Sequence, residues 1–193
     1  MKNGNILLNF YKKLEPFYSQ PYRYFYNNEY FLSLLAEYDE VPHENMDRES
    51  ILALLVNKIY FNPTIENICV AKYNLSLLKK MVEADPIPNI DWALVEEYLI
   101  KLNIEESKEE LGILFDFEHA WFGESNAIYF HNIAKYRKEF PLLNDACYYE
   151  RRISEITHLL AKSSIYNTPY FREKYEQQAR INLLTELKLL RSN

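Results

Sequence analysis

Glycine, cysteine and tryptophan are scarce in this chain of 193 residues, which contains 3, 2 and 2 of them. So little glycine argues against collagen-like proteins and against the glycine-rich loops that cradle phosphate groups. The two cysteines, Cys69 and Cys147, are too few for a disulfide-stabilised scaffold. We expect both to be small buried apolar side chains in a reducing compartment.

Long apolar runs and the motifs of the common enzyme classes are missing as well. No run approaches the roughly 18 apolar residues of a membrane-spanning helix, and Asn9, Lys12 and Lys13 interrupt the first apolar patch before it resembles a signal peptide. The sequence has no nucleophile elbow, P-loop, dinucleotide-binding glycine pattern, HExxH or CxxC motif. We therefore expect a cytoplasmic protein that has no cofactor and binds no membrane.

The charge balance is acidic. Lys and Arg number 22 against 28 Asp and Glu, which gives a net charge of −6. Nucleic-acid binding gains affinity from cations that neutralise phosphates, so this balance argues against it and favours a basic protein as partner. Two basic clusters, residues 135–138 and 151–152, are interpreted as cations that the helix dipole favours late in a helix.

Apolar residues recur at helical spacing in nearly every segment, as in the stretch from Asn27 to Tyr38. Strand signals are scarce, so we predict an all-α protein of about seven or eight helices, with residues 1–193 in one compact domain and an aromatic-rich lead-in over about residues 1–26. Capping residues and prolines give the boundaries. We expect helix starts at Asp47, Asn62-Pro63, Asn89 or Asp91, Ser125, Asn144 or Asp145, and Thr168-Pro169, and a helix from Glu105 to Phe122 that ends at Gly123 in a left-handed conformation.

Two features suggest a surface that binds another protein, although the alternative interpretations are a tyrosine-rich core whose hydroxyls reach the surface and carboxylates on solvated or dipole-complementing helix faces. Aromatic residues make up 16% of the chain and are dense near its beginning, where Tyr22, Tyr24 and Tyr26 follow one another closely. Carboxylates gather in two zones. The residues assigned to them are Glu37, Asp39 and Glu40 in the first zone, and Glu105, Glu106, Glu109 and Glu110 in the second.

Glutamate and histidine at helical spacing form the strongest candidate for chemistry. Glu155 and His158 are three residues apart, which places both on one helix face, as in di-iron helical bundles. Glu118 and His119 could add a carboxylate and an imidazole. The one other Glu-x-x-His, Glu40 to His43, contains Pro42 and so does not fit a helix interior, which leaves these four residues as weak candidates for metal ligands.

Two classes of function therefore remain open. The first, which we favour, is a non-enzymatic protein-binding domain; one specific form is a bacterial immunity-type inhibitor that neutralises a basic toxin or nuclease by presenting carboxylates and aromatic rings to it. The alternative is a small helical enzyme or a metal- or cofactor-binding bundle that uses Glu155 and His158. The sequence sets no oligomeric state.

Overall fold

The computed structural model describes residues 10, 12–42, 46–63, 65–83, 86–103 and 111–192. Over these residues it contains helices and no strands, which confirms the prediction of an all-α protein. The chain divides into two compact units, residues 1–111 and 112–193, and each is described by itself. The single domain predicted for residues 1–193 stays a prediction. None of the helices in the described ranges is long and apolar enough to cross a membrane.

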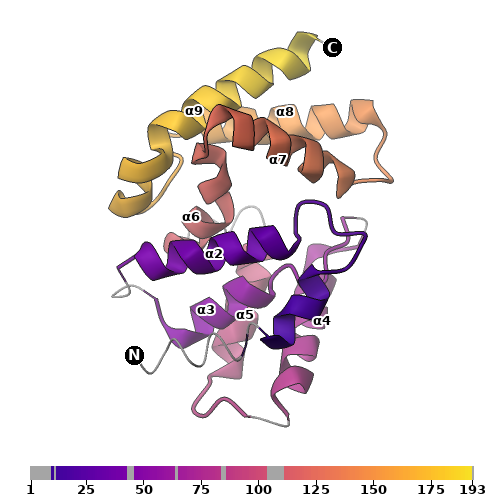
Figure 1. Ribbon diagram of the computed structural model, residues 1–193, viewed down its shortest axis with the longest axis vertical. Coiled ribbons are helices and arrows are strands. Elements are labelled where there is room, and N and C mark those ends of the chain that lie inside the picture. The colour runs from indigo at the N-terminus through magenta and orange to yellow at the C-terminus, as the bar shows by residue number, and fades with distance from the viewer. Residues whose placement is uncertain are drawn as a thin grey trace. The chain divides into compact units, whose positions relative to one another are not determined.

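Unit 1 contains a helical stretch at residues 12–18 followed by four longer helices (Figure 1). These are α2 (Asn28–Glu40), α3 (Arg48–Val56), α4 (Asn67–Val82) and α5 (Trp92–Asn103). Helix α5 packs against both α3 and α4. The phenol ring of Tyr18 stacks on Phe31 of α2, with 4.7 Å between the ring centroids, and its hydroxyl donates to the carbonyl oxygen of Leu55 at 2.9 Å. The N-terminal aromatic residues thus contribute to the core of this unit.

The end of α3 is held by side chains from distant parts of unit 1. Asn74 on α4 donates from Nδ2 to the carbonyl oxygens of Asn57 and Tyr60, at 2.8 and 3.1 Å, and accepts from the Tyr60 amide at 3.0 Å. Arg23 donates to the carbonyl oxygens of Lys58 and Ile59. These carbonyls belong to the C-cap and the turn that follow α3, so the contacts satisfy backbone groups outside the helix and fix the chain direction there.

Unit 2 contains four α-helices and one short 3-10 helix, η3. They are α6 (Ile113–His119), η3 (Ala120–Gly123), α7 (Asn126–Lys138), α8 (Asp145–Ala161) and α9 (Pro169–Ser192). Helix α9 is the longest of the described helices and packs on α8 and η3 (Figure 1). The backbones of η3 and α9 approach each other closely at Gly123, because a β-carbon at this position would be 2.5 Å from the β-carbon of Tyr175.

Several predicted helix starts are confirmed by side-chain caps. The carboxylate of Asp47 accepts from the Ser50 amide at 2.6 Å, Asp91 accepts from the Ala93 amide at 3.0 Å, and Asn144 accepts from the Cys147 amide at 2.8 Å. Such bonds satisfy amides that the first turn of a helix leaves open. Helix α7 follows Ser125 and α9 begins at Pro169, as predicted.

Other predictions about local structure are wrong. Helix α4 starts at Asn67, not at Asn62-Pro63. Before the helix, Asn74 holds Tyr60 by hydrogen bonds, and the Ile65 amide donates to the carbonyl oxygen of Asn62 in a turn. Gly112 precedes α6 with a φ of +50° instead of lying inside a helix, and Gly123 has no left-handed φ. The cysteines predicted to be buried, Cys69 and Cys147, are both exposed.

Candidate functional site

The first predicted acidic zone lies at the end of α2. Asp39 and Glu40 are exposed, whereas Glu37 is buried at 8% exposure and therefore does not contribute to the surface. All three residues are in the last turn of the helix, where the carbonyl dipoles make carboxylates unfavourable. The helix has four acidic residues and no basic one, so no cation within α2 offsets this unfavourable interaction. Residues 105, 106, 109 and 110, which form the second zone, lie outside the described residues.

The three tyrosines predicted to bind a partner have different environments. Tyr22 and Tyr24 are exposed by 62% and 42%, whereas Tyr26 is 8% exposed. The ring of Tyr26 packs against Phe61, with 4.8 Å between centroids, and the ammonium of Lys58 lies 5.5 Å from its centre. Tyr26 therefore belongs to the core of unit 1, and of the three only Tyr22 and Tyr24 are exposed.

The outward side of α2 has an apolar centre between acidic ends. Its exposed residues recur three and four positions apart, which places them on one side of the helix. We call this the α2 face and define it as Glu29, Leu32, Ser33, Ala36, Asp39 and Glu40. The Leu32 side chain is 45% exposed at its centre. Since α2 has 13 residues, the face is about 20 Å long, with Tyr24 just before its start.

The four weak metal-ligand candidates lie in unit 2. His119 is buried, its Nδ1 is 2.7 Å from the carbonyl oxygen of Phe115, and its ring stacks on the Phe115 ring at 4.0 Å. Glu118 is also buried, Glu155 pairs with Arg152 at 2.9 Å, and His158 is exposed. In the part of the chain that the structure describes, no three His, Cys, Asp or Glu residues come together in a group that could hold a metal ion.

Sequence reasoning missed a buried charge cluster around Arg152. We interpreted this residue as a cation that the dipole favours late in a helix, but it lies in the middle of α8 and its side chain is 1% exposed. Arg152 donates to both carboxylate oxygens of Glu186 at 2.9 Å and to the hydroxyl of Tyr129 at 3.2 Å. Burial disfavours the charged guanidinium, but the carboxylates of Glu155 and Glu186 outweigh it and hold the pKa of Arg152 well above its ordinary value.

The position of Arg152 was readable in part from the sequence. Tyr148, Arg152, Ile156 and Leu159 recur four, four and three positions apart, and these are the buried residues of α8. Extending the apolar spacing of Tyr148 and Ile156 would have placed Arg152 on the buried side. Its partner Glu186 lies 34 residues away, and no local pattern links the two. The cluster joins α7, α8 and α9, so we assign it to the fold of unit 2.

Two further carboxylates attach α9 to the rest of unit 2. Asp116 on α6 is fully buried and accepts from the amides of Asn167 and Thr168 at 2.7 and 2.8 Å, and from the Thr168 hydroxyl at 2.7 Å. It therefore holds the two residues that precede α9, from about 50 residues away in the sequence. Burial raises the pKa of the Asp116 carboxyl, although these hydrogen bonds act in the opposite direction.

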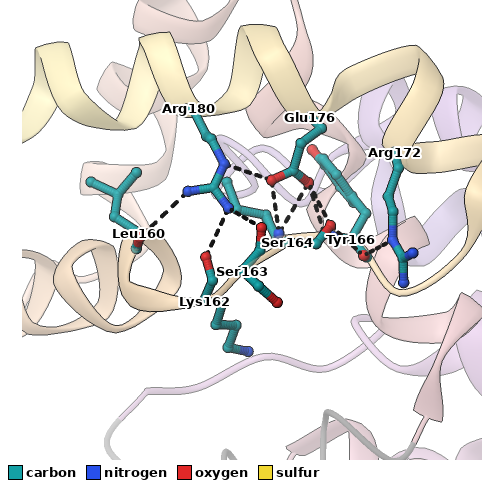
Figure 2. A network of polar contacts seen from close by, with 9 residues as sticks. Leu160, Lys162, Ser163, Ser164, Tyr166, Arg172, Glu176 and Arg180 are labelled. Atoms are coloured by element: carbon teal, nitrogen blue, oxygen red, sulfur yellow. Dashed lines mark hydrogen bonds and ion pairs between the residues drawn. The ribbon is translucent and has the colours of Figure 1, made fainter.

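Glu176 and Arg180 hold the connection between α8 and α9 (Figure 2). The Glu176 carboxylate accepts from the amides of Ile165 and Tyr166, and from Arg180 Nε at 2.7 Å. Arg180 also donates to the carbonyl oxygens of Lys162 and Ser163, at 2.8 and 3.1 Å. Burial alone would raise the pKa of Glu176, but the backbone amides outweigh it and lower that pKa. The side chains of Glu176 and Arg180 are thus bound to backbone groups and fix the conformation of the connection between α8 and α9.

The chain matches no protein-family model, no curated protein and no solved structure.

Proposed function

We propose that this protein is a non-enzymatic binding protein that docks on a basic protein through the α2 face. The observation that carries the proposal is the composition of that face, with exposed Leu32 and Ala36 at the centre and Glu29, Asp39 and Glu40 at the ends. A protein interface has the same organisation, because an apolar centre excludes water and a charged rim steers the encounter.

The distribution of charge between the units supports a basic partner. Unit 1 has 18 acidic and 11 basic residues, a net charge of −7, whereas unit 2 has 10 and 11, a net charge of +1. The acidity of the chain is therefore confined to the unit that contains α2. A field of one sign on one part of a protein accelerates association with an oppositely charged partner.

The last turn of α2 adds a second line of support. Asp39 and Glu40 are placed where the helix dipole disfavours them, so local helix stability does not explain them. Departures from local rules concentrate at functional surfaces. The specific form that we propose is an immunity-type inhibitor, in which these carboxylates occupy the phosphate-binding surface of a basic toxin or nuclease.

The test is an association-rate measurement with matched charge changes. A partner is isolated from native lysate on the immobilised protein, identified by mass spectrometry and purified. Asp39→Lys with Glu40→Lys should slow association by about tenfold or more and flatten its salt dependence, because rim charges act mainly on encounter. Glu66→Lys with Glu83→Lys changes the net charge of unit 1 by the same amount at exposed positions of α4 and its flanks, and serves as the control.

A second pair of variants separates the two halves of the proposal. Leu32→Ala should accelerate dissociation by about tenfold while leaving the association rate nearly unchanged, as expected for a central apolar contact. Charge reversal at residues 105, 106, 109 and 110 is measured separately, because that zone was predicted on the same grounds. Equal slowing by the test and control pairs would reduce the effect to overall charge, and no change in either rate would contradict docking through α2.

A further inference from the structure

Helix α9 exposes a stripe that is spaced like the seam of a coiled coil. Lys174, Gln177, Ile181, Leu184, Lys188 and Arg191 are all exposed and follow one another at alternating intervals of three and four residues. This is the spacing at which residues meet a partner helix. We call these six residues the outer stripe. Ile181 and Leu184 at its centre are 48% and 47% exposed, although the solvent side of a surface helix is normally polar.

The charges on the outer stripe are all positive. Lys174 precedes the apolar centre, and Lys188 and Arg191 follow it. Two such helices side by side would bring cations together in either direction: antiparallel pairing about Ile181 and Leu184 places Lys174 near Arg191 of the other copy. Like charges at this range are unfavourable. The stripe is therefore suited to a helix with an apolar centre and carboxylates on both sides of it.

The chain itself carries such a helix surface. The α2 face has Leu32 and Ala36 at its centre, with Glu29 before them and Asp39 and Glu40 after them. At about 1.5 Å per residue, Glu29 and Glu40 are about 17 Å apart along their helix, and Lys174 and Lys188 are about 21 Å apart along α9. The difference is within the reach of a lysine side chain. The apolar centres can thus meet while opposite charges pair at both ends.

We propose that the outer stripe of α9 binds the α2 face of a second copy of this chain. The two surfaces differ, so the contact is heterologous and leaves one free surface at each end of a pair. Its helix-on-helix area is well below the roughly 1,200–2,000 Å² of stable complexes, so we expect a dissociation constant on the order of 100 µM. The proposal goes beyond the function proposed above, because it assigns a role to unit 2 and needs no foreign protein.

Sedimentation of the full chain from about 10 µM to 1 mM tests the proposal. The weight-average mass of the wild type should rise with concentration and rise less in 500 mM than in 50 mM salt, since paired surface charges are screened. Ile181→Gln with Leu184→Gln should abolish the rise. Leu32→Gln should weaken association by about tenfold, as expected for a buried leucine side chain. Leu142→Gln is the control, because Leu142 is 76% exposed and lies on neither surface.

Mixing the two kinds of variant gives the most specific outcome. The α9 variant keeps an intact α2 face and the Leu32→Gln variant keeps an intact outer stripe, so at concentrations well below 1 mM their equimolar mixture should form mainly 1:1 dimers. Far-UV circular dichroism verifies that both variants fold. A wild type that stays monomeric at 1 mM, a Leu32→Gln variant that associates like the wild type, or a mixture without dimers would each overturn the proposal. None of these results bears on docking to a basic partner, which is measured with that partner at micromolar concentration.

Discussion

Replacing Gly123 by alanine tests how closely η3 approaches α9. A β-carbon at this position would lie 2.5 Å from the β-carbon of Tyr175 and 2.6 Å from its Cδ1. The nearest atom is fixed to the α9 backbone, so no rotation of the tyrosine relieves the contact. To restore an ordinary separation of 3.4 Å, the two elements must move apart by about 0.9 Å.

That movement would also affect the hydrogen bonds on either side of Gly123. Asn182 Nδ2 donates to the carbonyl oxygens of Phe122 and Glu124, both at 2.8 Å, and an added 0.9 Å takes both beyond hydrogen-bonding distance. Overpacking costs about 1–3 kcal/mol and each lost bond about 1 kcal/mol. We therefore expect Gly123→Ala to lower the free energy of unfolding of unit 2 by about 3–5 kcal/mol.

Urea unfolding followed by tryptophan fluorescence measures this loss. The protein has one tryptophan in each unit, so a Trp92→Phe background leaves Trp121, within η3, as the reporter for unit 2. Gly112→Ala is the matched control: a β-carbon there meets nothing within 4 Å, and the φ of +50° alone should cost about 1–2 kcal/mol. Tyr175→Ala should not rescue Gly123→Ala, because alanine keeps the β-carbon. A loss below 1 kcal/mol for Gly123→Ala would refute the reasoning.

Three further predictions concern the polar groups of unit 2. Glu176→Gln should lower the free energy of unfolding by about 1–3 kcal/mol at pH 7, because it weakens the bonds to Arg180 and the loop amides. Since the folded-state pKa of Glu176 is lowered, its stabilising contribution is present above the unfolded pKa of about 4.3 and is lost as the pH falls through the folded value. The urea midpoints of variant and wild type should therefore converge below pH 4. Tyr148→Phe should be neutral or stabilising, since the Tyr148 hydroxyl is buried without a hydrogen-bond partner among the described residues. Tyr129→Phe should instead lower the free energy of unfolding by about 1–3 kcal/mol, because it removes the bonds to Glu186 and Arg152. Equal losses of stability in thermal unfolding would contradict this difference. Elemental analysis of purified protein should find no stoichiometric transition metal, and one or two equivalents of iron, manganese or zinc that disappear in His158→Ala would instead favour a metal-binding bundle.

The parts of the fold that depend on neighbouring residues were predictable from the sequence. Asp47, Asp91 and Asn144 mark helix starts because a capping side chain reaches amides only two or three positions ahead. The same reasoning failed at Asn62-Pro63. There the deciding contacts come from Asn74, which belongs to the following helix and holds Tyr60 in place.

The candidate binding surface was predictable only in part, for a related reason. Helical spacing identifies which residues share a side of α2, but burial depends on what packs against that side. Tyr26 is enclosed by Phe61 and Lys58, more than 30 residues away, so the sequence around it does not show that it is buried. The burial of Arg152 likewise depends on a distant residue, because its carboxylate partner Glu186 is on another helix. Composition gave the acidic balance, while its confinement to unit 1 required knowing where the units divide.

The hydrogen bonds of Asp116 have a consequence for how the segment before α9 opens. Residues that flank the end of a helix normally open locally, and their amides exchange with solvent quickly. The amides of Asn167 and Thr168, which directly precede α9, are instead held by the buried carboxylate of Asp116, on a helix that precedes them by about 50 residues. To release them, this segment must separate from α6. Hydrogen exchange at these two amides should therefore be as slow as in the middle of α9, and it should report on the cooperative opening of unit 2.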